Sequence, residues 1–219
     1  MTTLDLEPLF YCGDDVHRAK IQKVQDALIR RDLDALLLLK HDAVRYVTEF
    51  YAKGYRPFLD IEYAALVPRG RDAVLGFTTA GEERRAAIRS RVRETRRLPR
   101  LAEWPAALAV MLADYSLARG RVGFDLLPQF MYQGLRDRLP GLELIDASDV
   151  WVDIAAIKHP LEVVLIERAL KIAQEGTAVA IEAAAPGRTE IEVSAAAEYR
   201  MRTLGSEMNP FIPVVASGP

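Results

Sequence analysis

The sequence has few of the residues on which several classes of protein depend. It contains a single cysteine, Cys12, so no disulfide can form within the chain. Its longest apolar runs, such as residues 35–39, are far shorter than the roughly 20 residues of a membrane-spanning helix. The formal net charge of −2 gives no general attraction to nucleic acid or to anionic membranes. Because the first residues also carry acids where a signal peptide carries Lys or Arg, we expect a soluble, cytoplasmic protein that binds neither nucleic acid nor membrane.

Motifs that commonly carry catalysis are also missing. The histidines His17, His41 and His159 lie far apart, and none belongs to a metal-binding pattern such as His-Glu-x-x-His. We expect His17 on a solvated helix face and His159 at a helix N-cap. His41 is expected at a strand end, either as a turn residue or near a substrate mouth. No glycine-rich phosphate loop is present. The sequence therefore predicts no metal site and no catalytic residue in this chain.

The order of elements predicts an α/β fold for residues 1–153. Helical patterns cover residues 14–31, 80–91, 102–117 and 128–138. Strand patterns cover residues 34–40, 96–99, 121–125 and 143–148, and a hairpin is predicted over 61–78. This alternation favours a mixed sheet with flanking helices, and roughly 150 residues suffice for a complete domain.

Residues 154–219 begin with a different pattern. A long helix is predicted at about 160–184, with Pro160 at its first position and Glu162 in its first turn. Two adjacent apolar stripes run along it, which indicates that the helix is mostly buried.

A second helix and a strand are predicted next. Thr189 and Glu192 form a capping box, and the helix that it starts ends near Leu204. The run from Phe211 to Val215 has the β-branched and aromatic character of a strand. Such a helix–helix–strand unit needs a sheet to lie on. We therefore expect this region to be the incomplete first part of an α+β domain.

These segments carry a resemblance to a known family. "IKHPLEVVLIERALKIAQEG", "APGRTEIEVSAAAEYRMRTLGSE" and "PFIPVVASGP" follow one another and resemble the opening of the catalytic domain in the creatinase, prolidase and aminopeptidase P family, the M24-type or pita-bread enzymes. The preceding domain resembles the N-terminal domain of that family, including "DALLLLKHDAVRYVTEF" with its segment Tyr46–Phe50. Because the resemblance spans the chain in order, it is more specific than a single motif.

The resemblance implies a subunit in two parts. The N-terminal domain would shape and partly cover an active site, often that of the partner subunit in a homodimer. The catalytic domain would bind two divalent metals (Mn, Co or Zn) through two Asp, one His and two Glu, whereas creatinase-like members use a His base without metal. In the family those residues follow the "VVASGP" strand. We therefore expect this chain alone to lack them and to be inactive.

The segment "FYAKGYRPFLDIEY", residues 50–63, carries the candidate binding residues. In creatinase-like members an Arg-Pro in the corresponding loop reaches the substrate carboxylate across the dimer interface. The resemblance thus implies that Arg56 binds a substrate carboxylate, with Tyr55 as a weaker companion. A guanidinium can bind a carboxylate bidentately. The alternative is an aromatic cluster that packs the dimer interface, with Arg56 in a structural ion pair.

Eight arginines and a single acid, Glu94, lie between Arg84 and Arg100. Such a cluster can bind nucleic acid or an acidic ligand. The segment lacks aromatic residues on which bases could stack, however. A solvated or subunit-facing helix and strand edge is the favoured interpretation.

Two functions of different classes follow. In the first, the protein is part of a C–N-cleaving hydrolase that acts on a Pro-containing dipeptide or on a small amidino or cyclic amide compound. In the second, it is a non-enzymatic binding or dimerisation module that has a pita-bread-type fold.

Overall fold

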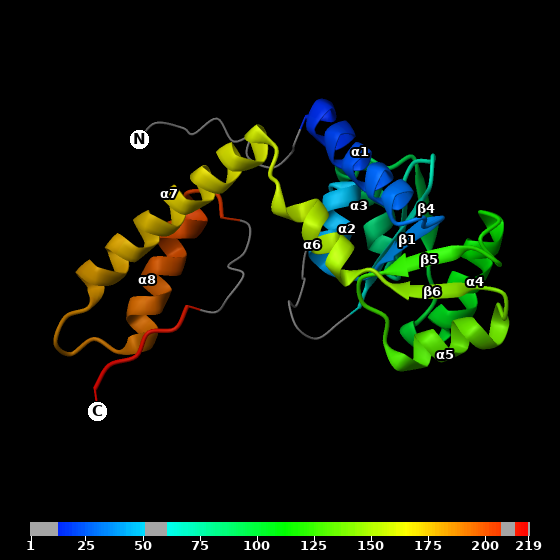
Figure 1. The fold of residues 1–219 in the computed structure, drawn as a ribbon. Helices are drawn as coiled ribbons and strands as arrows, with labels where there is room; N and C mark the ends of the chain where they lie inside the picture. Colours follow the sequence, from blue (N-terminus) through cyan, green and yellow to red (C-terminus); the bar gives the residue numbers. More distant parts are fainter. Residues whose placement is uncertain (1–12, 51–60, 207–212, 219) are drawn as a thin grey trace. The chain divides into compact units, whose positions relative to one another are not determined.

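The computed structural model describes residues 13–50, 61–206 and 213–218, and Figure 1 shows their fold. These residues form two compact units, one within Gly13–Ile157 and the other within Lys158–Pro219. The first unit contains the whole described sheet, and the second contains two helices and a short coil segment.

The first unit is built on a mixed six-stranded sheet, which confirms the predicted fold class. Its strands are β1 (Ala35–Leu38), β2 (Tyr63–Pro68), β3 (Val74–Phe77), β4 (Glu94–Arg97), β5 (Arg121–Phe124) and β6 (Glu143–Asp146). Their order in space is β4-β3-β2-β1-β5-β6. Of these strands, β2 runs against the other five, because it pairs antiparallel with both β1 and β3.

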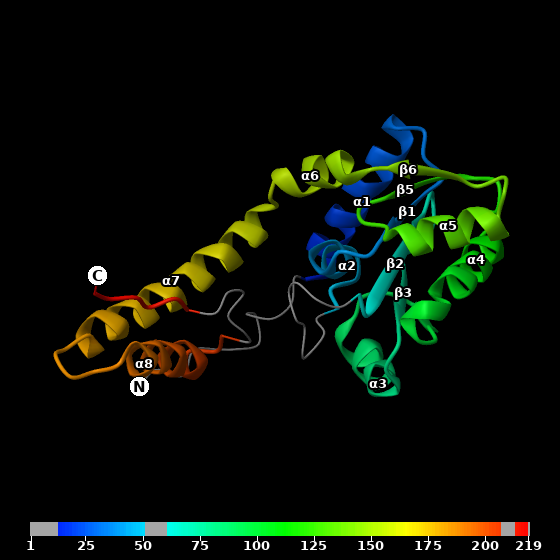
Figure 2. The ribbon, with the colours of Figure 1, turned by 90° about the horizontal axis from the view of Figure 1, so that it is seen from below.

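Helices cover both faces of this sheet (Figures 1 and 2). One face is covered by α1 (Asp14–Arg30), α2 (His41–Thr48), α3 (Ala80–Arg89) and α6 (Ser148–Ala156). The other is covered by η2 (Leu101–Glu103), α4 (Trp104–Asp114) and α5 (Gln129–Arg138). In β1, Leu36 and Leu38 belong to the first core, and Ala35 and Leu37 belong to the second. This burial on both faces explains why β1 is continuously apolar.

The helices α2 and α6 are absent from the sequence prediction. Both are short, with eight and nine residues. In α6 the side chains of Val150, Trp151 and Ile154 are buried at spacings typical of a helix, and Trp151 packs edge-on against Tyr46 of α2 at 5.2 Å between ring centroids. Tertiary packing therefore stabilises two helices whose own sequence signals are weak.

The second unit consists of α7 (Pro160–Ala183) and α8 (Glu190–Thr203), and both predicted helix starts are confirmed. At α7, His159 Nδ1 accepts a hydrogen bond from the Leu161 amide, at 3.2 Å, and Glu162 accepts one from the His159 amide, at 2.8 Å. At α8, Thr189 Oγ1 accepts from the Glu192 amide at 3.3 Å, and Glu192 accepts from the Thr189 amide at 2.9 Å. Each helix therefore begins at a reciprocal cap.

The prediction that α7 is mostly buried is wrong for this structure. The stripe that contains Gly176 packs on α8, where a Cβ added at Gly176 would lie 2.6 Å from Met201 Cγ. The second stripe is open, and Val163, Ile166 and Leu170 are 42%, 44% and 57% exposed. Among the described residues of this unit, α8 is the one helix that α7 can pack against, and a single neighbour cannot cover two stripes.

The predicted strand near the end of the chain is not formed in residues 213–218, which have no helix or strand assignment. Phe211 and Ile212, the first residues of that predicted strand, lie outside the described part. In place of a strand ladder, the Ser217 amide donates to Glu190 Oε1 at 2.7 Å. Val214 is 89% exposed, so no strand among the described residues covers its side chain.

Candidate functional site

Polar residues gather at the edge of the sheet where β1 and β5 end, here named the C-terminal edge. Lys40 and His41 follow β1, and Asp125 follows β5. The first residue of β2, Tyr63, lies at the same edge, because β2 runs against β1 and Leu38 pairs with Ala65. In open α/β sheets, ligands bind outside the carboxyl ends of the strands. The C-terminal edge is therefore the candidate site.

Asp125 is the buried acid of this edge, with only 5% of its surface exposed. Its Oδ1 accepts a hydrogen bond from the Leu39 amide at 2.8 Å, and its Oδ2 accepts one from the Lys40 amide at 3.1 Å. Burial raises the pKa of Asp125 to about 6, although both hydrogen bonds and the Lys40 charge act in the opposite direction. Because both oxygens bind backbone amides, Asp125 holds the turn after β1 and thereby positions Lys40.

His41, the first residue of α2, is half-buried. Burial, and next the charge of Arg45, lowers its pKa to about 4. The imidazole is therefore neutral near pH 7. In that form one ring nitrogen can donate a hydrogen bond and the other can accept one.

The expectation of a solvated His17 is wrong. Its Nδ1 atom is buried and has no hydrogen-bond partner among the described residues. Burial lowers the pKa of His17 first, and the charges of Lys20 and Arg91 lower it further. His17 lines a hollow of about 480 Å³ between α1 and the segment at Arg91.

The predicted binding residues Tyr55 and Arg56 lie outside the described residues. Phe50 and Tyr63, at the two ends of that segment, belong to the first core. The rings of Phe50 and Tyr63 pack at 5.5 Å between centroids, and these residues are 1% and 7% exposed. The Phe50 amide donates to Thr48 Oγ1 at 3.1 Å, and this hydroxyl donates to the Val44 carbonyl at 2.6 Å. An aromatic contact at the C-terminal edge thus joins the two ends of the sequence that carries Arg56.

A buried ion pair lies directly before Phe50 in the sequence. Lys20 Nζ of α1 lies 2.7 Å from Glu49 Oε1, and both side chains are 7% exposed. Glu49 ends α2 with a left-handed backbone, φ 56°, which is uncommon for a residue other than glycine. The Lys20 ammonium also lies 4.9 Å from the centroid of the Tyr46 ring. The ion pair therefore fixes the backbone directly before Phe50.

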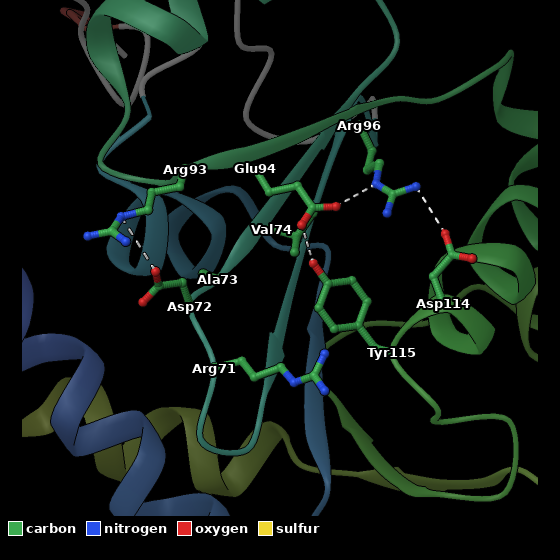
Figure 3. Close-up of a pocket in the computed structure, with 9 residues that line it drawn as sticks. All are labelled: Arg71, Asp72, Ala73, Val74, Arg93, Glu94, Arg96, Asp114 and Tyr115. Atoms are coloured by element: carbon green, nitrogen blue, oxygen red, sulfur yellow. Dashed lines mark hydrogen bonds and ion pairs between the residues drawn. The ribbon is translucent and has the colours of Figure 1, made fainter.

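A hollow of about 390 Å³ lies at the opposite edge of the sheet, where β3 and β4 begin (Figure 3). Glu94 accepts a hydrogen bond from the Tyr115 hydroxyl at 2.5 Å and one from Arg96 Nε at 2.7 Å. Arg96 also donates to Asp114 at 3.0 Å. The hydrogen bond from Tyr115 contributes most to lowering the pKa of Glu94, and burial, with that bond, raises the pKa of Tyr115 to about 12.

Charges in this hollow are balanced. The arginines Arg71, Arg93 and Arg96 line the hollow together with the acids Asp72, Glu94 and Asp114. Arg93 lies 3.8 Å from Asp72, and Arg96 pairs with Glu94 and Asp114. The hollow holds a network of ion pairs and hydrogen bonds between β4 and the end of α4, in which Arg93 and Arg96 are both paired with acids.

The arginine-rich segment 84–100 is largely matched by acids from several elements. Ion pairs join Arg85 to Glu82, Arg91 to Asp14, Arg93 to Asp72, Arg96 to Glu94 and Asp114, and Arg100 to Glu103. Most of these pairs are exposed, so each contributes little to stability. The pairing shows why a local surplus of arginine does not give a uniform basic surface.

Neither a metal cluster nor a membrane span is found in the part of the chain that the structure describes. No three His, Cys, Asp or Glu side chains among those residues come together to hold a metal ion. No helix there combines the length and the apolar character that crossing a bilayer requires.

Comparisons with known proteins agree with this architecture. The family model for the Creatinase/Prolidase N-terminal domain matches residues 20–154. An Xaa-Pro dipeptidase of Pyrococcus horikoshii is 26% identical over 207 residues, which are 93% of this chain and 53% of that protein.

Solved structures give the same result. The prolidase from Pyrococcus horikoshii OT3 has a TM-score of 0.67 at 25% identity, over 86% of this chain and 50% of that chain. The Xaa-Pro dipeptidase from Bacillus anthracis has a TM-score of 0.68 at 21% identity, with the same coverages. At this identity the comparison shows that the two folds are similar. The chain thus spans about half the length of the relatives that it matches.

Proposed function

The chain belongs to the creatinase/prolidase family, whose N-terminal domain it contains at residues 20–154, and on that basis we propose that it is the N-terminal part of a hydrolase that cleaves Xaa-Pro dipeptides. The observation that carries the proposal is the alignment with an Xaa-Pro dipeptidase over 93% of this chain. It favours a dipeptide over the amidino and cyclic amide compounds on which creatinase-like members act.

In this proposal the segment between Phe50 and Tyr63, two residues that pack together at the C-terminal edge, recognises the substrate. Arg56, assisted by Tyr55, binds the carboxylate of the dipeptide, because a guanidinium matches a carboxylate in two parallel hydrogen bonds. The support comes from the flanking residues. Phe50 and Tyr63 are packed together, and the buried pair of Lys20 and Glu49 fixes the backbone before them.

The first unit further serves dimerisation and covers part of an active site, and the protein acts in the cytoplasm. A cap of this kind excludes longer peptides and orients the dipeptide, which is a contribution to catalysis by positioning. The family resemblance also implies two divalent metals. The described residues do not fit such a centre, since they bring no three potential ligands together. Its ligands would have to come from other residues.

Substrate profiling of the longest polypeptide that the gene encodes tests this function. We expect hydrolysis of an Xaa-Pro dipeptide, stimulated by Mn²⁺, Co²⁺ or Zn²⁺, and little hydrolysis of the matching Xaa-Ala dipeptide or of creatine. Faster cleavage of creatine would assign the protein to the creatinase-like members. No turnover of any of them by metal-loaded protein would favour the non-enzymatic binding module.

A further inference from the structure

A second hollow adjoins the one in Figure 3 and differs from it in charge. Its volume is about 400 Å³, and it shares Arg71 and Tyr115 with its neighbour. It lies where β1 and β5 begin, at the edge of the sheet opposite Tyr63. The polar residues and the ring that line it are Asp34, Arg69, Arg71, Tyr115, Ser116 and Arg119.

The charges of this hollow do not cancel. Asp34 is its acid, and its carboxylate accepts hydrogen bonds from the Arg121 amide, at 2.8 Å, and from the Arg69 guanidinium. The bond from the Arg121 amide is the main reason that the pKa of Asp34 is lowered, so Asp34 stays ionised and neutralises Arg69. Neither Arg71 nor Arg119 forms an ion pair with any described residue. Within this hollow, the charges of Arg71 and Arg119 are therefore not matched by an acid in contact with them.

Both of these arginines are held in place by their surroundings. The Arg71 guanidinium carbon lies 5.6 Å from the centroid of the Tyr115 ring, and Figure 3 shows the guanidinium beside that ring. The Tyr115 ring is fixed in turn by its hydrogen bond to Glu94. The stem of Arg119 packs on Gly141, where an added Cβ would lie 2.9 Å from Arg119 Cγ. Preorganised side chains lose less entropy when a ligand binds.

Ser116 adds a hydroxyl at the same place. It follows the C-terminal end of α4 with a left-handed backbone, φ 62°, a conformation in which glycine or asparagine is usual. A serine there costs about 1 kcal/mol relative to an unstrained residue. Its hydroxyl lines the hollow and can donate one hydrogen bond.

We propose that this hollow binds a doubly charged oxyanion of the phosphate type, through Arg71 and Arg119 with the hydroxyl of Ser116. Two guanidinium groups match the two charges of such an anion, and each can bind two of its oxygens. The anion could be free phosphate or the phosphate group of an ester, since both present the same oxygens to the arginines.

Titration of the 219-residue chain with inorganic phosphate tests the proposal. Ionic strength is held constant with NaCl, and binding is followed by the arginine Nε–Hε signals in NMR and by calorimetry. We expect saturable binding that Arg71→Gln and Arg119→Gln each weaken at least about tenfold. A parallel titration with glycerol phosphate identifies the source, because the tighter of the two ligands is the one that the hollow accommodates.

Arg136→Gln is the matched control. Arg136 is also exposed and lies over a tyrosine ring, that of Tyr132 at 5.8 Å, but it does not line this hollow. The affinity of the Arg136→Gln variant for phosphate should equal that of the unmodified protein. Non-saturating shifts that chloride reproduces would overturn the proposal, as would unchanged affinity in folded Arg71→Gln and Arg119→Gln. Circular dichroism establishes folding, and Ser116→Ala, expected to weaken binding severalfold, gives a readout independent of both arginines.

Discussion

Lys20 and Glu49 form an ion pair of 2.7 Å that is almost fully buried between α1 and the end of α2. The pair joins residues 29 positions apart in the sequence. Removal of one partner leaves the other charge buried without this counter-ion, which is more costly than removal of both.

We therefore predict that Lys20→Met and Glu49→Gln each lower the free energy of unfolding by about 3 kcal/mol. The double variant Lys20→Met/Glu49→Leu should lose less than either single change. Urea unfolding followed by circular dichroism measures all three. The exposed pair of Arg200 and Glu175 offers a comparison, and Arg200→Met should cost less than about 1 kcal/mol. Equal losses at the two pairs would contradict the role given to burial.

Asp125 predicts a dependence of stability on pH. Its pKa in the folded state, about 6, is higher than the pKa of about 3.9 for an unfolded Asp. As the pH falls, Asp125 therefore binds a proton at a higher pH in the folded state than in the unfolded state. This contribution to stability is complete below pH 4 and is lost as the pH rises through 6.

The comparison of the protein with Asp125→Asn at pH 5 and pH 7 isolates this effect, because Asn does not titrate. The difference in free energy of unfolding should move in favour of Asp125 by about 1 kcal/mol on going from pH 7 to pH 5. A difference that stays constant would show that Asp125 titrates normally.

Gly123, in the middle of β5, lies where the core leaves no room for a larger side chain. A Cβ at this position would lie 2.8 Å from Leu36 Cδ2 and 2.9 Å from Ala147 Cβ. Gly123→Ala should thus destabilise the first unit by about 1–3 kcal/mol. Gly81→Ala is the control, because nothing lies within 4 Å of its added Cβ and α3 gains a better helix former. It should be neutral or stabilising by up to about 1 kcal/mol in thermal unfolding.

The proposed role of Arg56 predicts a kinetic change in the longest gene product. Arg56→Ala should raise the KM for an Xaa-Pro dipeptide about tenfold or more, since a charge-assisted contact with the substrate carboxylate is lost. Circular dichroism should remain that of the unmodified protein. Arg84→Ala, which removes an exposed arginine of α3, should leave KM unchanged. An unaltered KM in Arg56→Ala would exclude the carboxylate role.

Much of the first unit could be predicted from local patterns. All six strands overlap the segments that predict them. In β1, burial on both faces leaves a continuous apolar signal at Leu36–Leu38, whereas β4 has the charged sequence Glu94–Arg97 and carries no such signal. Strand order could not be predicted, since no local feature of β4 states that it pairs with β3. The helices α2 and α6 were missed for a related reason. Trp151 and Tyr46 stabilise each other only once the fold brings them together.

The candidate site was less predictable. The acid after β5, Asp125, carries a usable signal, because a lone carboxylate directly after a buried strand must find partners near the strand end. The pairing of Lys20 with Glu49 has no such signal, as the helical face around Lys20 looks solvated in the sequence. The packing of α7 was also misjudged. Apolar residues such as Leu170 indicate a surface that can be covered, not one that is covered in the structure.

The reversed direction of β2 has a consequence for how this domain can diversify. Since Phe50 and Tyr63 pack together, the residues at the end of α2 and the start of β2 lie at the same edge of the sheet. Insertions or deletions between these rings would alter the entropy of loop closure by only fractions of a kcal/mol. They would leave the pairing of Leu38 with Ala65 in register. Specificity could therefore drift in this stretch while the fold stays the same.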